Sequence, residues 1–328
     1  MTRAEALKKF LDNHQEEKEE IRKKFLEGIG EKSDQIIDTI FQAFDDLGEV
    51  SENQQKEDCV HFLFGLQRCD LLKNRAIIRL DVMGPAWYMD EDRLTTQLDL
   101  TFLFCEYFEW KEKLLLEIRS FMGKVNRYDV EILVQDEIIN SNQLIVQFLR
   151  FAFRNLEEQE CFSRIGKMPY WIIRWGEYRN YSEIVLRVNR EEGKEAVWLE
   201  QLERSGEDAD AMVAEYWYKT DIHEGDCEKK RMYFTTFEEC SLSKINFGKA
   251  GLMGARFIRC RLEGCNFTEA NLRQADFEDC QFEDNVFKGA ELFQATFSEQ
   301  GFPRENFTEN QLKEMFLVRM ELQNEAED

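Results

Sequence analysis

Few residues of this chain stand at the spacings that metal-binding or catalytic motifs require. The three histidines, His14, His61 and His223, are far apart, and none has a second ligand at the spacing of a metal site. The segment HEGDC places His223 close to Asp226 and Cys227, which suits a metal ion, but a solvated linker explains the same residues. No Walker loop, dinucleotide fingerprint, GxSxG or HExxH motif occurs. The sequence therefore predicts no cofactor, no metal site and no catalytic residue.

The segment WIIRWGEYR brings Trp171, Arg174, Trp175 and Arg179 close together. Aromatic rings beside an arginine are typical of protein-binding hot spots. An ordinary core whose guanidinium groups reach solvent has the same composition. We interpret the acidic run at 90–92 as the first turn of a helix, where the helix dipole stabilises negative charge. Neither segment identifies a reaction.

The composition narrows the class of protein. A formal net charge of −23 argues against unassisted nucleic-acid binding, which needs clustered Lys and Arg, and against attraction to an anionic membrane. The first residues lack the apolar run of a secretory signal, and no apolar run is long enough to span a bilayer. The nine cysteines include no CxxC pair, so we expect reduced, buried thiols in a cytoplasmic protein.

From residue 237 to residue 297, every fifth residue is Phe or Leu. The positions are Phe237, Leu242, Phe247, Leu252, Phe257, Leu262, Phe267, Leu272, Phe277, Phe282, Phe287, Leu292 and Phe297. Two residues earlier in each unit stands Ala or Cys, except at Thr235, Ile245 and Asn285. An accidental helix does not explain the pattern, because residues five apart drift around a helix. Similar residues also recur every twenty, which indicates coils stacked on one another.

The units ANLRQ, ADFED and AELFQ resemble those of the pentapeptide-repeat proteins. The resemblance covers about residues 231–307 and implies a right-handed quadrilateral β-helix, with the large and small residues inside. Three to four coils are then expected over 226–307. An inward Asn285 must find hydrogen-bond partners in the coil backbone. The column of Cys240, Cys260 and Cys280 is expected to be inert, because thiols in an apolar column are buried.

The outward residues of the coils bear on a DNA-mimicking function. Some long pentapeptide-repeat proteins resemble B-form DNA and bind DNA gyrase, which needs a long rod with an acidic face. Here the column is short, and residues 232–307 hold 8 Lys and Arg against 12 Asp and Glu, with opposite charges one coil apart. The outward apolar residues Met253, Ile258 and Phe293 mark the surface where we expect another element or a partner to dock.

The fold class is multidomain, with a mostly helical N-terminal domain followed by a β-solenoid. Residues 1–225 form the first domain, with a minor β element, and residues 308–328 form a capping helix and tail, because both ends of the column need covers. Helices are predicted at 2–28, 33–47, 51–72, 93–122, 129–156, 195–204, 208–219 and 309–324, and a strand at 76–83. The segment 170–189 fits either a strand pair or a short helix.

Three hypotheses for the function follow. The leading one is a non-enzymatic protein–protein interaction module or scaffold, whose partner is a protein that the sequence does not identify. The second is an enzyme or ligand-binding protein with its site in the N-terminal domain, and the third is a gyrase-binding DNA mimic. A pocket lined by converging Arg, Tyr or carboxylate groups would favour the second hypothesis. An exposed apolar patch without such a pocket would favour the first. The sequence predicts no oligomeric state.

Overall fold

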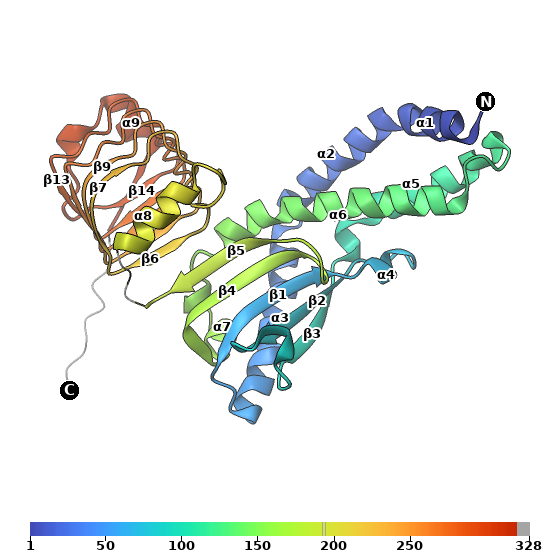
Figure 1. The fold of residues 1–328 in the computed structure, drawn as a ribbon, viewed down its shortest axis with the longest axis horizontal. Helices are drawn as coiled ribbons and strands as arrows, with labels where there is room; N and C mark the ends of the chain where they lie inside the picture. Colours follow the sequence, from blue (N-terminus) through green and yellow to red (C-terminus); the bar gives the residue numbers. More distant parts are fainter. Residues whose placement is uncertain (192, 194, 320–328) are drawn as a thin grey trace. The chain divides into compact units, whose positions relative to one another are not determined.

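The computed structural model describes residues 1–191, 193 and 195–319. The chain divides into two compact units, Met1–Leu186 and Arg187–Asp328 (Figure 1). The first unit combines helices with a mixed sheet, and the second is a column of stacked coils. Strands in the register of the column begin at Tyr216, before the expected start at residue 226. Among the described residues, no helix has the length and apolarity that a bilayer-spanning segment needs.

The first unit contains seven α-helices and five strands in its described residues. The helices are α1 (Arg3–Asn13), α2 (Gln15–Glu31), α3 (Ser33–Gln54), α4 (Arg68–Leu71), α5 (Cys105–Glu117), α6 (Arg127–Ala152) and α7 (Glu160–Ser163). The short 3-10 turns are η1 (Trp87–Met89), η2 (Thr101–Leu103), η3 (Ile118–Phe121) and η4 (Leu156–Glu158). The strands are β1 (Cys59–Leu66), β2 (Ile77–Met83), β3 (Leu94–Asp99), β4 (Lys167–Glu177) and β5 (Ser182–Asn189), the last of which runs into the second unit.

The five strands form one sheet in the order β3-β2-β1-β4-β5. β1 pairs antiparallel with β2, and β2 with β3, whereas β1 and β4 run parallel. The register places Leu63 of β1 opposite Asp81 of β2 and Arg174 of β4. Because paired residues point to the same side, these three side chains share a face. Their neighbours Phe62 and Phe64 point to the other face.

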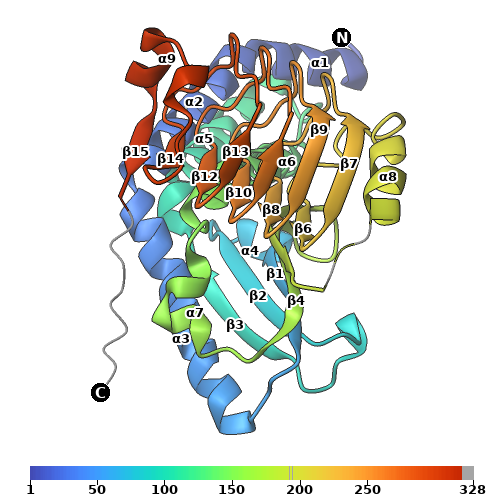
Figure 2. The ribbon, with the colours of Figure 1, turned by 90° about the vertical axis from the view of Figure 1, so that its left-hand side faces the viewer.

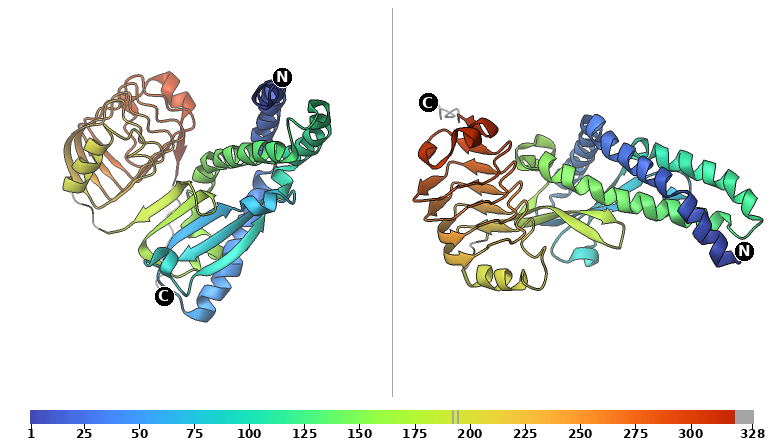
Figure 3. Two further views of the ribbon diagram at one scale, coloured as in Figure 1. Left: turned by 45° about the vertical axis from the view of Figure 1, so that its right-hand side comes forward. Right: turned by 90° about the horizontal axis from the view of Figure 1, so that it is seen from above.

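Helices α3, α6 and α7 cover one face of the sheet (Figure 3). The ring of Phe44 in α3 lies 6.4 Å from that of Phe62 and 4.9 Å from that of Phe162 in α7. Trp175 of β4 donates a hydrogen bond from Nε1 to Oδ1 of Asn142 in α6 at 2.9 Å. These aromatic rings are almost fully buried, and burial of such a side chain contributes about 1.5–3 kcal/mol. The core of the unit therefore lies between this face and the helices.

Helices α1, α2, α5 and α6 pack along one another and extend beyond the sheet (Figure 1). The predicted helix at 2–28 is interrupted at His14, which separates α1 from α2. The buried His14 ring contacts Glu17 through Nδ1 at 3.4 Å and Glu117 through Nε2 at 3.2 Å. Trp110 of α5 donates to the same Glu17 at 3.1 Å. Polar contacts between the helices therefore hold this charged segment in place.

Three predicted helices are partly or wholly replaced by strands and turns in the structure. The helix at 51–72 is wrong between Gln54 and Arg68, where β1 lies at the centre of the sheet and is buried on both faces, whereas Arg68–Leu71 is helical as α4. Such a strand has apolar residues at helical as well as at alternate positions. The helix at 93–122 is wrong at its start, which is strand β3, and 208–219 forms turns and a strand. The strand at 76–83, the helix at 195–204 and a strand pair within 170–189 are confirmed.

The second unit is a β-solenoid of about five turns over residues 216–318 (Figure 2). Its strands form two parallel sheets, in the orders β15-β14-β12-β10-β8-β6 and β13-β11-β9-β7. The strands are β6 (Tyr216–Tyr218), β7 (Asp221–Asp226), β8 (Thr236–Glu238), β9 (Ser241–Asn246), β10 (Arg256–Ile258), β11 (Arg261–Glu263), β12 (Asp276–Glu278), β13 (Gln281–Glu283), β14 (Thr296–Ser298) and β15 (Phe316–Val318). Helices α8 (Glu195–Arg204) and α9 (Glu309–Glu314) and turn η5 (Arg304–Asn306) complete it.

The strands of the column pair at a register of twenty residues, as predicted. Phe257 lies opposite Phe237 and Phe277, and its ring stacks on theirs with centroids 5.1 and 4.7 Å apart. Phe267 stacks in the same way on Phe247 at 5.0 Å. The inward residues from Phe237 to Phe297 are buried, except for the partly buried Phe282, so the core of the column consists of stacks of similar side chains. The right-handed sense and the four-sided cross-section remain predictions.

One coil precedes the repeats that the sequence pattern revealed. Its inward residues are Trp217, Ile222, Cys227 and Met232, each twenty residues before a repeat position. None of the four is Phe or Leu, so the Phe and Leu pattern does not reveal them. The segment HEGDC consequently lies in and just after strand β7, and the prediction of a solvated linker there is wrong.

Helix α8 covers the first coil (Figure 2). Trp198 is fully buried, with its ring 5.1 Å from that of Trp217 and 5.7 Å from that of Phe237. Leu202 and Met212 join the same cluster. The cover that the sequence requires at this end is therefore supplied by the column's own unit.

Helix α9 covers the last coil. Gln311 donates hydrogen bonds to backbone carbonyl oxygens of that coil, including Phe287 at 2.8 Å. The predicted extension of this helix is wrong at Met315, where the backbone is extended and strand β15 joins β14. Leu317 stands twenty residues after Phe297, so the chain returns to the repeat register. The last residues of the predicted helix lie outside the described part of the chain.

Candidate functional site

The two tryptophans of the predicted interaction surface lie in the core of the first unit. Trp171 and Trp175 are 3% and 0% exposed, because their side of β4 faces the helices. Arg174 points to the opposite face and donates from Nη1 to the carbonyl oxygen of Ser182 at 3.3 Å. The predicted surface is corrected accordingly: of these three residues, only Arg174 reaches the helix-free face.

The outward apolar residues of the column differ in exposure. Ile258 is buried, with 8% of its surface exposed, and Met253 is half-buried. Phe293 is 47% exposed, and the guanidinium group of Arg273 lies 5.2 Å from the centre of its ring. Of the three predicted docking residues, only Phe293 is exposed.

The helix-free face of the sheet carries a cavity of about 780 Å³. Leu63 and Arg174, neighbours in the sheet register, contribute from strands β1 and β4. The segment between β2 and β3 contributes Trp87, Tyr88 and Arg93, and the segment after β4 contributes Arg179, Asn180, Tyr181 and Ser182. Three arginines and three aromatic rings thus line one cavity, and each of its two loop walls carries both kinds of side chain.

Two glycines allow the turn between β4 and β5 to fold over the sheet. A Cβ atom on Gly65 would lie 2.8 Å from Cα of Tyr178, and one on Gly176 would lie 2.2 Å from the carbonyl oxygen of Tyr181. The turn contains Arg179 in the left-handed region, with φ of 58°. The close approach of these backbones places Arg179 and Tyr181 beside the central strands.

Trp87 has a backbone conformation that bulky residues rarely adopt. Its φ is 55°, in the left-handed region. Its ring meets that of His61 edge to face, with centroids 4.0 Å apart. Its N–H donates to the carbonyl oxygen of Gly84 at 3.1 Å, and its carbonyl oxygen accepts from the N–H of Asp90 at 3.0 Å. Such strain costs about 1–3 kcal/mol and persists only where the surroundings enforce it.

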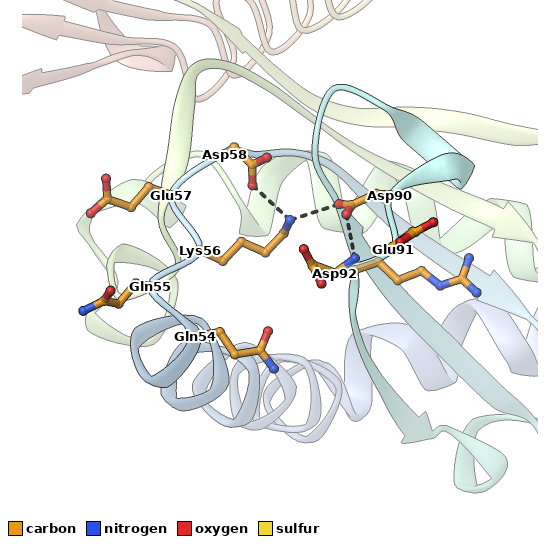
Figure 4. Close-up of a pocket in the computed structure, with 9 residues that line it drawn as sticks. Gln54, Gln55, Lys56, Glu57, Asp58, Asp90, Glu91 and Asp92 are labelled. Carbon is orange, nitrogen blue, oxygen red and sulfur yellow. Dashed lines mark hydrogen bonds and ion pairs between the residues drawn. The ribbon is translucent and has the colours of Figure 1, made fainter.

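A cluster of charges at the base of this loop provides that restraint (Figure 4). Lys56 Nζ lies 2.9 Å from Asp58 Oδ1 and 3.0 Å from Asp90 Oδ2. Asp90 also accepts from the N–H groups of Gly84 at 2.6 Å and Asp92 at 3.0 Å. Burial opposes ionisation of Asp90, but the hydrogen bonds from Gly84, Lys56 and Asp92 outweigh it and lower its pKa. The acidic run is therefore a loop brace, and its prediction as a helix start is wrong.

The charged groups around the sheet face fall into a paired and an unpaired set. Asp81 is 1% exposed and accepts from Nε of Arg79 at 2.9 Å and from Oγ1 of Thr95 at 2.7 Å. Within the described residues, Arg93 and Arg179 form no ion pair. The nine residues that line the cavity include no Asp or Glu. The cavity is consequently a positive site in a protein of net charge −23.

His61 lies under Trp87 and is uncharged at neutral pH. Burial, and then the positive charge of Arg174, lower its pKa to about 4. Its Nδ1 atom is buried and has no hydrogen-bond partner in the described residues. Burial also raises the pKa of Tyr88. Both rings are therefore neutral, and the charge of the cavity comes from its guanidinium groups.

This arrangement can hold an anionic group beside a planar ring. Guanidinium groups bind carboxylates and phosphates through paired hydrogen bonds, and aromatic side chains offer flat apolar surface. In the described residues, no group of three His, Cys, Asp or Glu could hold a metal ion. The ring of His223 contacts Ser243 at 3.2 Å.

The sequence indicated Arg174 and Arg179 through the segment WIIRWGEYR but not the other residues of the cavity. Trp87 and Tyr88 follow Gly84–Pro85 after a single alanine, and such a turn between two strands is a position where side chains are presented at a sheet edge. The signal was hidden because β3 was taken for the start of a helix. Once β3 is a strand, the aromatic pair and Arg93 fall in a connecting loop.

Comparison with known proteins concerns the column. A family described as a pentapeptide repeat region matches residues 230–307. These residues form a pentapeptide-repeat domain. No curated protein matches the chain.

Similar solved structures also belong to pentapeptide-repeat proteins. HetL of Nostoc sp. strain PCC 7120, involved in heterocyst differentiation regulation, is 22% identical over 26% of this chain and 40% of its own, with a TM-score of 0.26. Rfr23 of Cyanothece 51142 is 26% identical over 26% of this chain and 58% of its own, with a TM-score of 0.25. QnrB1, a plasmid-mediated fluoroquinolone resistance protein, is 25% identical over 24% of this chain and 41% of its own, with a TM-score of 0.18. This chain spans less than two thirds of each.

Within the pentapeptide-repeat domain, the polar residues at small positions bind the coil beneath. Each donates to the backbone carbonyl oxygen 23 residues earlier, at 2.6–3.3 Å. The pairs are Thr235 to Met212, Cys240 to Trp217, Cys260 to Phe237, Cys265 to Leu242, Cys280 to Phe257 and Asn285 to Leu262. At alanine positions the carbonyl accepts a backbone N–H instead, as Phe267 does from Ala270 at 3.0 Å. The thiols are thus structural donors.

Proposed function

We propose that this protein is a non-enzymatic interaction module that recognises an anionic segment of a protein partner with the helix-free face of its first unit. The observation that carries the proposal is the cavity in which Arg93, Arg174 and Arg179 accompany three aromatic rings. Arginine, tryptophan and tyrosine are the side chains that dominate binding energy at protein interfaces. The pentapeptide-repeat domain serves as a rigid scaffold.

The surroundings of the cavity support a macromolecular partner. Met89, next to the cavity loop, is 87% exposed, and the lining residues Tyr181 and Tyr88 are 64% and 39% exposed. Large apolar side chains of this exposure are covered when a partner binds. Arg93 and Arg179 supply positive charge that no acidic residue of the described chain neutralises by an ion pair. The partner segment should therefore carry negative charge.

The proposal is tested with a fluorescein-labelled hexaglutamate peptide and the full chain, by fluorescence anisotropy at low and physiological salt. We expect binding that weakens as salt rises, because exposed charges are screened. Arg93→Glu and Arg179→Glu should each weaken binding on the order of tenfold or more, since a hydrogen bond to a charged group contributes about 1.5–3 kcal/mol.

Arg119→Glu is the matched control. Arg119 is exposed, belongs to the same unit, forms no ion pair in the described residues and does not line the cavity. If this control weakens peptide binding as much as Arg179→Glu does, the effect is one of net charge and the proposed site is refuted. Absence of binding by a correctly folded chain would refute the proposal as well.

The second candidate is an enzyme or ligand-binding protein that uses the same cavity. It is favoured by the neutral His61 ring, whose buried Nδ1 lacks a partner in the described residues, close to an arginine-lined cavity. A gyrase-directed DNA mimic has less support, because outward charges pair between coils. Arg256 lies 3.7 Å from Asp276, and Lys249 lies 3.4 Å from Glu269. Supercoiling by gyrase should be unchanged in the presence of the protein.

A further inference from the structure

We propose that the anionic group held by this cavity is the phosphate of a monoester that also carries a planar aromatic ring, as in a phosphotyrosine side chain or a nucleoside monophosphate. The inference rests on the proposed function and concerns the same cavity. It is carried by three features of the lining: the number of guanidinium groups, the aromatic side chains beside them, and the size of the space.

The guanidinium groups come from three separate elements. Arg174 belongs to strand β4, Arg93 to the segment that leads into β3, and Arg179 to the turn between β4 and β5. A carboxylate offers two oxygens in one plane, whereas a phosphate monoester offers three terminal oxygens and close to two negative charges at neutral pH. Three arginines from different sides, without an acidic lining residue, suit the phosphate better.

The side chain of Arg179 is exposed and lies against an aromatic ring. Its guanidinium carbon lies 5.3 Å from the centre of the Tyr178 ring, and that of Arg79 lies 5.4 Å from the same ring. Contacts of this kind are favourable between a cation and an aromatic face. A pre-positioned arginine loses less conformational freedom on binding, which favours affinity for a small anion.

The aromatic side chains require more than a free phosphate. Trp87 and Tyr88 line the cavity from one loop, and Tyr181 lines it from the other. Leu63 contributes apolar surface from strand β1. Inorganic phosphate has no apolar surface to place against them. A planar ring would be stabilised by each aromatic contact beyond simple burial. The cavity of about 780 Å³ lies within the size range of sites for such ligands.

The conformation of Trp87 is consistent with a binding role. Its left-handed backbone is held by Gly84, by Asp90 and by the ion pairs of Lys56. Strained residues of this kind are concentrated at ligand-binding sites, where the surroundings hold them ready. If the role of this position were only structural, glycine or asparagine would serve, because both adopt a positive φ with little strain.

The test is isothermal titration calorimetry of the full chain with phenyl phosphate and with inorganic phosphate. We expect phenyl phosphate to bind on the order of tenfold more tightly. Trp87→Asn, which removes the ring and tolerates a positive φ, should abolish that advantage and leave the affinity for inorganic phosphate unchanged. Arg179→Gln should weaken both ligands, and Arg119→Gln should weaken neither. Circular dichroism of each variant checks that the fold is retained.

The outcomes separate this inference from the proposed function. Equal affinities for the two ligands, both reduced by Arg179→Gln, would refute the inference that the ligand carries an aromatic ring. The proposed anion-binding module would remain supported. Hexaglutamate binding without any phosphate binding would overturn the inference alone. If neither hexaglutamate nor phenyl phosphate binds the folded chain, the inference and the proposed function both fail.

Two further ligands distinguish the sources of the ring. A phosphotyrosine peptide that binds more tightly than adenosine monophosphate, and whose unphosphorylated form does not bind, would support the inference and a protein partner. Adenosine monophosphate that binds more tightly than the peptide would support the inference and replace the protein partner by a nucleotide. If neither binds more tightly than inorganic phosphate, the inference is overturned.

Discussion

At the scale of single residues, a polar side chain at a small position of the repeat links two coils of the column through hydrogen bonds. Asn285 stands where most units have Ala or Cys, and it uses both ends of its amide. Its Oδ1 accepts from the N–H of Cys265 at 2.8 Å, and its Nδ2 donates to the carbonyl oxygen of Leu262 at 2.9 Å. The sequence predicted these backbone partners from the inward position alone, because a buried amide must be satisfied.

Replacement of Asn285 should therefore destabilise the column through lost hydrogen bonds. We expect Asn285→Ala to lower the free energy of unfolding by about 1–3 kcal/mol for each buried group left without a partner. Asn285→Cys should recover part of the loss, because a thiol can donate to Leu262 as Cys265 does to Leu242. Urea denaturation followed by circular dichroism measures both changes. Equal stability of Asn285→Ala and the wild type would contradict the assignment.

His61 provides a pH-dependent contribution to stability in the first unit. Its pKa is about 4 in the folded chain, below the ordinary value of about 6.5 that applies after unfolding. Between these values the unfolded state binds more protons, so the free energy of unfolding should rise as the pH increases from about 4 to about 6.5. Below pH 4 this contribution is lost completely.

The titration of His61 is measured by nuclear magnetic resonance of its ring protons. We expect Arg174→Gln to raise the pKa of His61, because a nearby positive charge is removed, and we expect a bound phosphate to raise it further. A His61 pKa near 6.5 in the folded wild-type chain would contradict the burial of the ring. A pKa that does not respond to Arg174→Gln would remove the proposed electrostatic link to the cavity.

At the scale of elements, the structure shows which patterns carry information. The column was predictable because a period of five within twenty leaves no competing arrangement, and its register of twenty is confirmed. Strand β1 was not, because a central strand buried on both faces has no alternation to detect. The end of α9 was mistaken for a longer helix because Leu312 and Phe316 also fit helical spacing. Long-range pairing settles both cases, and it is not visible in a local pattern.

Phe267 tests the stacked core of the column. Its ring is fully buried and lies 5.0 and 4.8 Å from the rings of Phe247 and Phe287. Loss of a buried Phe side chain alone costs about 3–5 kcal/mol, and an unpaired carboxylate among aromatic rings costs more. We expect Phe267→Asp to unfold the coils cooperatively, since each coil is stabilised by its neighbours. Phe267→Leu should fold with a smaller loss, and an unchanged melting curve for Phe267→Asp would contradict the inward position.

At the scale of the whole molecule, the chain carries its recognisable repeat in one unit and its candidate site in the other. The sequence identified the unit with a regular period and predicted a docking surface on it. The cavity could not be derived in the same way, because its lining comes from four short segments between residues 63 and 182. Only the folded sheet brings Leu63, Trp87 and Arg179 to one place. Arg174 was found through its composition, but its direction depends on the register of β4.

The cysteines report on both units at once. Cys69 and Cys105 of the first unit are exposed, whereas Cys227, Cys240, Cys260, Cys265 and Cys280 of the second are buried. Burial raises the pKa of Cys227 to about 12 and that of Cys265 to about 11, so few thiolates exist to react at neutral pH.

We expect N-ethylmaleimide to modify the two exposed cysteines in the native protein. The five column cysteines should become reactive together as urea unfolds the coils, because stacked coils lose their structure cooperatively. Peptide mass spectrometry at a series of urea concentrations gives the site of each modification. Early modification of any one column cysteine, in parallel with Cys69, would show that the column opens locally or that its thiols are not buried.

The twenty-residue register also restricts how this column can change in length. Insertion or deletion of twenty residues adds or removes one complete coil, about 4.8 Å in height. Helices α8 and α9 then still cover end coils of the same shape. An insertion of one residue instead shifts the register by one, so that every later inward side chain points outward. The height of the column can therefore be engineered, or can evolve, only in whole steps.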